Sequence, residues 1–389
     1  MRILFVHPRI FAGGAEKAIV HLAHQLERLG HEVAVCTISA KLEELPPIAK
    51  QVYYIVPEKP VQSSRLDSST MAVRSIVAEI ATFLSLIQNC CDDFDVLSPC
   101  NFPAYWSTCA YRDRRPIVWI SSEVFGPYGA SRDLYDKSMI FRMATQALAI
   151  LDKYVVKRSV DKIVTCSELN RNLIWERYGL DATVIPTAVD YQFFSADGSG
   201  EKEDLGLEDS YVLLHVGSLI KRKNQILSIR ALHQLKRMIA NVKLVLVGEG
   251  PWELILRDEV RRLALDKDVI FTGRISEEEL RDLYHICDAN IFPVVEQTYG
   301  LVPFEALAAG KLSLVSQNSG AGMLMKDFGI GYPITPDVQS IVNGVLELWK
   351  YSECFEESIA KGRAYVRENL TWERYAAEMA DVYEAVCNS

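Results

Sequence analysis

The sequence predicts an α/β protein built from two doubly wound parallel-sheet domains. Short β-branched or apolar runs alternate with longer amphipathic stretches, which is the pattern of parallel strands covered by helices on both faces. The chain has 389 residues, too many for one ordinary core. A small, polar and charged stretch at 195–206 interrupts the alternation, which then begins again. We therefore expect one domain over 1–195 and a second over 206–370.

In the first domain, strand and helix signals follow one another in order. The run ILFVH at 3–7 predicts a strand, and the stretch from about Ala15 to Leu29 predicts a helix that Gly30 can end. The later apolar runs predict strands at 32–38, 52–56, 95–99, 116–121, 162–167 and 183–187. Apolar residues recur at helical spacing over 71–90, 138–158 and 168–178.

The second domain repeats this alternation. Its apolar runs predict strands at 211–218, 242–250, 269–273, 289–293 and 311–316. Its amphipathic stretches predict helices at about 224–240, 252–264, 277–287 and about 301–309. A last helix is expected at 371–386, with Thr371 as its N-cap.

Composition and charge exclude several classes of protein. A net charge of −9 and a pI near 5.4 do not suit a nucleic-acid binder, which needs a basic face. Nine cysteines without regular spacing predict neither a disulfide framework nor a zinc site, and they fit a reduced, cytoplasmic protein. The opening MRILFVHPRI has too short an apolar run for a signal peptide, and no run is long enough to span a membrane. The helix at 71–87 is apolar enough to touch a lipid surface, but sheet-covering helices have the same composition.

Gly13 and Gly14 lie in the turn between the first strand and the first helix. Glycine lets the backbone approach a ligand closely there, and the helix start beyond can receive an anion or an acceptor hydroxyl. The spacing is not Gly-x-Gly-x-x-Gly, so the dinucleotide fingerprint is not met. A tight turn without a ligand explains the pair equally well.

The turn after the strand at 211–218 carries three cations. Gly217 and Ser218 end the strand, and a basic triplet at 221–223 precedes the next helix. Open α/β sheets bind ligands at the carboxyl ends of their strands. Cations placed there can neutralise a pyrophosphate and stabilise it as a leaving group. A solvated basic loop is the alternative interpretation.

The stretch PVVEQTYGLVPFEALAAGK at 293–311 carries the strongest signal. Glu296 and Gln297 follow a strand, where a polar side chain can face a sugar. Residues 299–302 begin a helix whose free N–H groups can bind a diphosphate. Glu305, one turn inside, is placed to accept hydrogen bonds from ribose hydroxyls. A capped amphipathic helix with an acid in its first turn is the alternative.

Two other patterns do not predict a metal site. Asp93 and Asp95 have an Asp-x-Asp spacing, but they lie in the acidic stretch CDDFD, which is better explained as a solvated loop. The seven histidines lack metal-ligand spacing apart from His21 and His24, which have no carboxylate in register and indicate a helix surface or core edge. We therefore expect no metal.

Blocks of sequence along nearly the whole chain resemble the retaining glycosyltransferases of family 4. The opening is GGAEKAIVHLAHQLERLGHEVAV, and VIPTAVDYQFF is similar to the VIPNGVDxxxF that ends the family's first domain. HVGSLIKRKNQ, LVLVGEGP, VIFTGRISEEELRDLYHICDANIFP and EQTYGLVPFEALAAGK follow in the family's order. The resemblance implies the GT-B fold, in which two Rossmann-like domains face a central cleft and a C-terminal helix, here 371–389, packs back on the first domain.

The resemblance also implies roles in binding a nucleotide diphosphate sugar, which is a co-substrate rather than a cofactor. Lys223 would contact the diphosphate, and Glu305 would bind the ribose as the second glutamate of a Glu-x7-Glu motif. Further donor-binding positions implied in this way are Gly14, Ser218, Arg222, Gly273, Arg274, Tyr299, Gly300, Leu301 and Val302. Gly273 and Arg274 lie at the base-binding loop, and 300–302 offer backbone amides to the phosphates and sugar.

The first position of the Glu-x7-Glu motif departs from the family pattern. Counting from Glu305 places Gln297 there, with Glu296 one residue early. Either a local bulge lets Glu296 serve, or Gln297 binds the sugar hydroxyls as a neutral amide. We keep Lys223, Glu296 and Gln297 as the candidate catalytic residues.

Two more departures concern the partners of these residues. Ser218 stands where the family has an arginine beside the lysine, with Lys221 or Arg222 as alternative substitutes. The family's first-domain histidine near the reaction centre has no match, and Ser122 and Glu123 lie in that region as acceptor-side candidates.

We expect a hexose to move from a UDP- or GDP-sugar to the hydroxyl of a glycan, lipid or small-molecule acceptor, with retained anomeric configuration. The resemblance implies that the departing phosphate deprotonates the acceptor, while the protein positions the reactants and stabilises charge. The departures leave a catalytically degenerate nucleotide-sugar-binding or scaffold protein as the main alternative. An epimerase of the same fold and a dehydrogenase fit the motifs less well.

The acceptor leaves few signals in the sequence. Aromatic residues that could stack on an acceptor sugar, although core packing explains most of them, are Tyr105, Trp106, Trp119, Phe125 and Tyr128. We expect the protein in the cytoplasm, with a weak peripheral contact to the inner membrane face as a further expectation.

Overall fold

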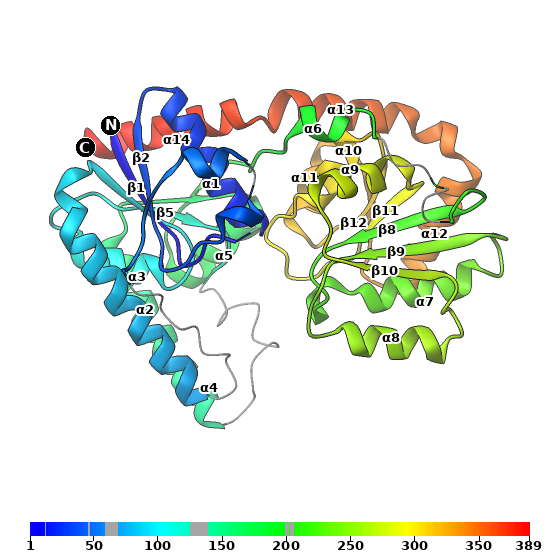
Figure 1. Ribbon diagram of the computed structural model, residues 1–389, viewed down its shortest axis with the longest axis horizontal. Coiled ribbons are helices and arrows are strands. Elements are labelled where there is room, and N and C mark those ends of the chain that lie inside the picture. The colour runs from blue at the N-terminus through cyan, green and yellow to red at the C-terminus, as the bar shows by residue number, and fades with distance from the viewer. Residues whose placement is uncertain (12, 46, 59–68, 125–138, 199–201, 203–205) are drawn as a thin grey trace. The chain divides into compact units, whose positions relative to one another are not determined.

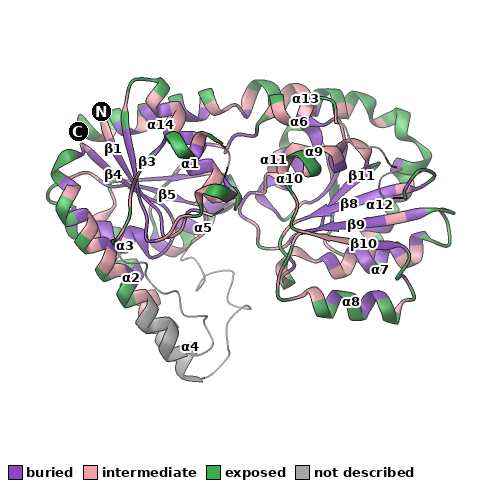
Figure 2. Ribbon diagram, viewed as in Figure 1, coloured by how far each residue is buried: buried purple, intermediate pink, exposed green. Residues whose placement is uncertain are grey.

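The computed structural model describes the chain except for residues 12, 46, 59–68, 125–138, 199–201 and 203–205 (Figure 1). Side chains are also not described at 69–75 and 139–147. The described chain forms two compact units, of which the first comprises Met1–Ala188 and Trp372–Ser389 and the second Val189–Thr371. The strands of both units are largely buried, and most of the helices have one buried and one exposed face (Figure 2).

The first unit contains two parallel sheets joined by bridges. The first sheet has the order β3-β2-β1-β4, with bounds β1 Arg2–Val6, β2 Glu32–Cys36, β3 Tyr53–Ile55 and β4 Val96–Pro99. The second has the order β5-β6-β7, with bounds β5 Val118–Ser121, β6 Lys162–Thr165 and β7 Thr183–Val184. Single bridges from Leu97 to Ile117 and from Cys100 to Ile120 connect β4 with the segment that forms β5. The strands are parallel, and the order in which they are added to the sheet reverses between β1 and β4.

Helices cover the sheets of the first unit. Their bounds are α1 Gly14–Arg28, α2 Ser69–Cys90, α3 Ala104–Thr108, α4 Met139–Ser159, α5 Glu168–Tyr178 and α14 Trp372–Cys387. The last helix, α14, buries Tyr375, Met379 and Tyr383 in the same apolar core as α1 and β1. The hydroxyl groups of Tyr383 and Ser98 lie 2.7 Å apart. The His21 ring stacks on Trp372 with its centroid 4.6 Å away, so this histidine lies at a core edge.

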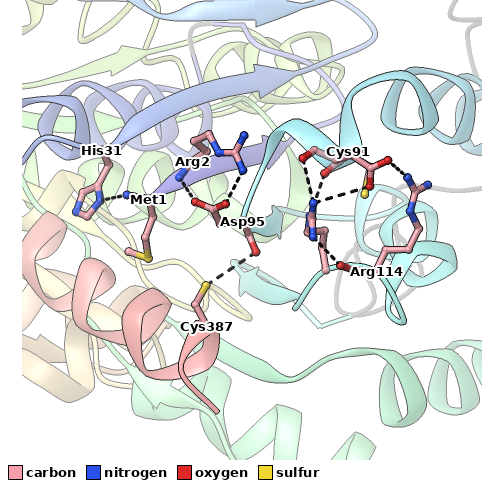
Figure 3. A network of polar contacts seen from close by, with 9 residues as sticks. Met1, Arg2, His31, Cys91, Asp95, Arg114 and Cys387 are labelled. Carbon is pink, nitrogen blue, oxygen red and sulfur yellow. Dashed lines mark hydrogen bonds and ion pairs between the residues drawn. The ribbon is translucent and has the colours of Figure 1, made fainter.

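The acidic stretch at 91–95 is held by arginines. Asp95 accepts hydrogen bonds from the backbone N–H of Arg2 at 2.8 Å and from its guanidinium at 2.9 Å, and Asp92 forms an ion pair with Arg114 (Figure 3). The Arg2 side chain lowers the pKa of Asp95 from its ordinary value. The carboxylate of Asp95 therefore stabilises the start of β1 in this structure.

The second unit is a six-stranded parallel sheet in the order β10-β9-β8-β11-β12-β13. The strands are β8 Tyr211–Val216, β9 Val242–Val247, β10 Val269–Gly273, β11 Ala289–Phe292, β12 Ser313–Ser316 and β13 Tyr332–Ile334. The helices are α6 Tyr191–Ser195, α7 Gln225–Leu235, α8 Glu253–Arg262, α9 Glu277–Ile286, α10 Val302–Ala308, α11 Gly320–Phe328, α12 Val338–Lys350 and α13 Glu356–Asn369. The strand order reverses between β8 and β11, and open α/β sheets bind ligands at the carboxyl ends of such strands.

The prediction of an α/β fold with doubly wound parallel sheets is confirmed, and the differences are local. The strand expected to 218 ends at Val216, because Gly217 turns the chain away with φ 150°. The helix expected to residue 240 ends at Leu235. Residues 317–370, for which we predicted no elements, contain α11, β13, α12 and α13. The N-caps of α11 and α12, Ser319 and Asp337, each accept a backbone N–H in the first turn and were readable start signals.

Candidate functional site

The chain turns at the carboxyl end of β8, and the turn packs so closely on the residues after β9 that two of them must be glycine. A Cβ atom on Gly248, which follows β9, would lie 2.4 Å from the carbonyl oxygen of Gly217. A Cβ on Gly250 would lie 2.4 Å from the carbonyl oxygen of Leu219. The backbone of 217–219 therefore packs directly against the end of β9. This contact explains the glycines of the VGEG stretch and fixes the position of Ser218.

Lys223 links this turn to the loop after β11. Its Nζ donates a hydrogen bond to Gln297 Oε1 at 2.8 Å and lies 5.4 Å from the centroid of the Phe292 ring. Asn224 follows in the left-handed region at φ 57°, and its amide donates to the carbonyl oxygen of Pro293 at 2.9 Å. The backbone N–H of Val295 donates to the carbonyl oxygen of Arg222 at 3.1 Å. The basic turn and the loop after β11 thus form one hydrogen-bonded structure.

Glu296 and Gln297, the two candidates for the first position of the Glu-x7-Glu motif, differ in exposure. Glu296 has a positive φ of 54°, which is uncommon for a residue other than glycine, and its side chain is exposed. Gln297 is half-buried and its side-chain oxygen meets Lys223. In this structure Gln297 contacts the lysine, and which of the two residues meets the sugar stays a prediction.

The loop that follows is fixed by backbone contacts. The N–H groups of Gly320 and Ala321 at the start of α11 donate to the carbonyl oxygens of Gln297 at 3.0 Å and Tyr299 at 3.2 Å. Gly300 has φ 112°, and a Cβ there would lie 2.7 Å from Cζ of Phe292. Glycine is therefore required at this position for both its backbone angle and its lack of a side chain.

The helix that begins after this loop is shorter than expected. It is α10, seven residues long, and it starts at Val302 after Leu301, which has a helical backbone but provides no side-chain cap. Pro303 has no N–H, so the amides that can face a ligand at this end are those of residues 300–302. Tyr299 is buried and its ring stacks on Phe304 with centroids 5.3 Å apart, so its side chain belongs to the core of the unit.

Glu305 has a buried partner that the sequence did not reveal. The hydroxyl group of Tyr284, on α9, donates to Glu305 Oε2 at 2.7 Å. Tyr284 is fully buried, and burial together with the Glu305 carboxylate raises the pKa of Tyr284 well above its ordinary value. The tyrosine therefore stays protonated and orients one oxygen of the carboxylate. An aromatic residue in the helix before β11 was the available signal, but nothing in its spacing distinguished it from core.

Gly273 and Arg274 lie at the same carboxyl edge, at the end of β10. The N–H of Gly248 donates to the carbonyl oxygen of Gly273 at 2.8 Å, and Gly273 has φ 70°. Arg274 is exposed beyond it. Because all strands of this sheet run parallel, the ends of β8, β10 and β11 share one edge.

The first unit contains the other candidates. Gly14 begins α1, and the Glu16 carboxylate folds over Gly13, where burial raises the pKa of Glu16. Ser122 and Glu123 are half-buried and directly follow β5. Ser122 and Glu123 therefore lie at the carboxyl end of β5.

Polar residues that the sequence did not single out lie buried at this edge. His7 follows β1, and its Nε2 lies 3.1 Å from the amide of Asn101. Burial lowers the pKa of His7 to about 4, so the imidazole is neutral at neutral pH. The Asn170 amide donates to the carbonyl oxygen of Ser121 at 2.9 Å and to Thr165 Oγ1 at 2.7 Å.

The aromatic acceptor candidates are mostly core residues. Tyr105 and Trp119 are fully buried, and their ring centroids lie 4.4 Å apart. Trp106 donates its indole N–H to the buried carboxylate of Asp152 at 2.8 Å. Phe125 and Tyr128 lie outside the described residues. The core packing expected for most of these aromatic residues is therefore confirmed for Tyr105 and Trp119, which do not line a groove.

Two family models match the chain, one in each half. The model described as Glycosyltransferase Family 4 matches residues 12–193, and the model described as Glycosyl transferases group 1 matches residues 200–364. An uncharacterized glycosyltransferase of Methanocaldococcus jannaschii is 25% identical over 98% of this chain and 97% of its own length. The lipopolysaccharide 1,2-N-acetylglucosaminetransferase of Salmonella typhimurium is 32% identical over 43% of this chain, and the match spans 47% of that enzyme.

The fold also matches solved structures. The crystal structure of Anabaena HepE in complex with UDP is similar with a TM-score of 0.77 and 18% identity, over 99% of this chain and 100% of HepE. The same protein has been solved in complex with UDP-glucose. At this identity the likeness concerns the fold. Within the described residues, no helix has the length and apolar character needed to cross a membrane.

Proposed function

Because the chain belongs to the glycosyltransferases of group 1 and family 4, with their GT-B fold, we propose that it moves a hexose from a nucleotide diphosphate sugar to an acceptor hydroxyl with retention of anomeric configuration. The observation that carries this proposal is the contact between Lys223 and Gln297 at the strand reversal of the second unit. A cation fixed at that edge is suited to a diphosphate.

In this proposal, different residues of the second unit bind different parts of the donor. Lys223 binds the diphosphate, and Glu305, oriented by Tyr284, accepts hydrogen bonds from the ribose hydroxyls. The amides of 300–302 bind the phosphates and the sugar, while Gly273 and Arg274 meet the base. We propose a UDP-sugar as the first donor to test, since HepE binds UDP and UDP-glucose in the same fold.

Gln297 places an uncharged amide, and not a carboxylate, where the sugar would bind. Its amide nitrogen remains available to donate while its oxygen accepts from Lys223. A carboxylate at this place would pair with the lysine and reduce the charge available to the leaving diphosphate. Glu296, exposed beside it, is the candidate for a second contact to the sugar.

Transfer then follows from positioning and charge stabilisation. As the glycosidic bond breaks, negative charge develops on the departing phosphate, and Lys223 stabilises it. The acceptor oxygen bonds to the anomeric carbon on the face from which the phosphate departs, and the departing phosphate oxygen takes the proton of the acceptor hydroxyl. Because the new bond forms on that same face, the configuration is retained. The first unit, with Ser122 and Glu123, binds the acceptor. The lysine supplies the positive charge, so we propose that the reaction needs no metal ion.

The site's departures favour one alternative, a nucleotide-sugar-binding protein without transferase activity. Ser218 in place of the arginine and the lack of the first-domain histidine remove two groups found in the enzymes that this chain resembles. Release of nucleotide from a panel of UDP- and GDP-sugars separates the two functions. Proton NMR of the anomeric signal in the product tests retention.

Calorimetry with UDP and GDP is the first experiment. We expect UDP to bind more tightly than GDP, and Glu305→Ala to weaken both. Binding of neither nucleotide would contradict the proposed donor site. Binding without turnover on any donor would support the non-catalytic alternative. For its location we propose the cytoplasm, with peripheral contact to the inner membrane face.

A further inference from the structure

The outward face of α4 carries an unusual group of side chains. Ile150, Leu151 and Tyr154 are 73%, 46% and 57% exposed. Single exposed apolar side chains are normal on a protein surface, but a cluster of them marks an interaction site. Here they are close neighbours on one helix, whose place in the first unit is shown in Figure 1.

The inward face of the same helix prevents α4 from rotating to bury them. Asp152 and Val156 are fully buried. The Asp152 carboxylate accepts hydrogen bonds from the hydroxyl group of Tyr105 at 2.7 Å, from that of Tyr178 at 2.6 Å and from the guanidinium of Arg177 at 2.9 Å. The indole N–H of Trp106 donates to the same carboxylate, so turning the helix would break all of these bonds and leave a buried charge unpaired, which is strongly unfavourable.

The outward face is also basic. Lys153, Lys157 and Arg158 are exposed, and the Arg158 guanidinium lies over the Tyr154 ring at 5.0 Å. Asp152 is the one acid between residues 148 and 159, and it is buried and paired. The chain as a whole has a net charge of −9, so this face has the opposite sign to the protein. Basic and apolar side chains on one helix face are typical of helices that lie on anionic membranes.

We propose that the α4 face formed by Ile150, Leu151, Lys153, Tyr154, Lys157 and Arg158 lies on an anionic lipid surface. The apolar side chains enter the headgroup boundary, while the cations meet lipid phosphates. This inference names the surface for the membrane contact proposed above, and it does not depend on the transfer reaction.

The sequence directed attention to a different helix. The stretch at 71–87 is more apolar and falls in α2, but Phe83 and Ile87 of α2 are fully buried in the core of the first unit. Between 76 and 90, where its side chains are described, α2 has no lysine or arginine. Its apolar character is explained by packing, so α4 is the helix suited to an anionic surface.

Co-sedimentation of the full chain with lipid vesicles tests the proposal. Vesicles of phosphatidylcholine alone are compared with vesicles of phosphatidylcholine and phosphatidylglycerol in equal parts. We expect several-fold stronger binding to the anionic vesicles, and a loss of binding at high salt. Lys157→Gln should weaken binding about fivefold, since each cation near an anionic surface contributes about 1 kcal/mol. Ile150→Ser should weaken it about tenfold, since it removes a large apolar side chain from the interface.

Matched variants come from the other unit. Leu254 on α8 is 74% exposed, and Lys350 at the end of α12 is also exposed. Leu254→Ser and Lys350→Gln make the same chemical changes away from α4 and should bind vesicles as the wild type does. Thermal unfolding followed by circular dichroism checks that all four variants stay folded.

The proposal is overturned if the wild type binds neither vesicle or binds both equally. It also fails if Ile150→Ser and Lys157→Gln sediment with vesicles as the wild type does. Self-association that Ile150→Ser abolishes, without vesicle binding, would assign this face to a second copy of the chain instead. UDP affinity is measured separately, so a failure here leaves the donor site untouched.

Discussion

The carboxyl edges of the two units present different chemistry. At the edge of the second unit, Lys223 and Glu305 are charged and each has a specific hydrogen-bond partner. At the edge of the first unit, two buried pairs consist of neutral groups, His7 beside Asn101 and Asn170 beside Ser121. Burial lowers the pKa of His7 to about 4, which keeps it uncharged. Under the proposed function, the charged groups of the second unit serve the donor, and the edge of the first unit serves the acceptor hydroxyl.

The largest effect that tests this difference concerns Lys223. Lys223→Ala should lower kcat by about 10²–10³, the usual effect of removing one group that stabilises developing charge. Affinity for UDP should fall much less. Steady-state kinetics at saturating donor, together with calorimetry, measure both quantities. Lys350→Ala, at the exposed end of α12, should leave kcat unchanged, and an unchanged kcat in Lys223→Ala would contradict the leaving-group role.

The next effect concerns donor binding by Glu305. Glu305→Ala should weaken UDP binding by roughly tenfold to a hundredfold, because hydrogen bonds to a charged group contribute about 1.5–3 kcal/mol. Tyr284→Phe keeps the carboxylate but removes the hydroxyl that orients it, so a smaller loss is expected. Calorimetry measures both. If Tyr284→Phe binds more weakly than Glu305→Ala, the loss comes from the core of the unit and not from the ribose contact.

A third effect concerns backbone conformation. Gly300→Ala adds a Cβ 2.7 Å from Phe292 at φ 112°, and should destabilise the second unit by about 1–3 kcal/mol. Gly30→Ala, in the first unit, places a Cβ at φ 88° with no atom within 4 Å, so it isolates the backbone cost. Thermal unfolding should show a larger decrease in Tm for Gly300→Ala. Equal decreases would mean that Phe292 adjusts without cost.

The smallest expected effect on donor affinity comes from a substitution in the first unit. Glu123→Ala should leave UDP affinity unchanged and lower the rate of transfer by about tenfold, the loss of one hydrogen bond to the acceptor. Calorimetry and transfer assays on the same preparation test this. A weaker UDP affinity in this variant would place Glu123 at the donor and remove the distinction between the two edges.

The place of the candidate site in the second unit was readable from the sequence, because residue type and spacing mark the ends of its strands. The order of strands and turns places Ser218, Lys223 and Glu305 at one edge, and parallel sheets make that inference reliable. Which of Glu296 and Gln297 contacts Lys223 was not readable, because the local backbone includes a positive φ at Glu296 that no spacing encodes. Tyr284 was missed for a similar reason, since a buried tyrosine in a helix is usually core.

The first unit was harder to read. Tyr105 and Trp119 were candidates for a sugar-binding groove, but burial around Asp152 decides their role, and burial depends on tertiary packing. The segment 317–370 was passed over although Ser319 and Asp337 are good N-caps, because its helices carry no chemical motif. In both regions the residue types encode packing and not a chemical motif.

The placement of α14 has a consequence for how the protein is made. Tyr375, Met379 and Tyr383 complete an apolar core whose other members come from α1, the strands of the first unit and the segment up to Ala188. While the ribosome is still translating the second unit, α14 has not yet been made and this apolar surface is exposed to water. We therefore expect a fragment ending at residue 188 to aggregate, and expect soluble protein when residues 372–389 are supplied as a separate peptide.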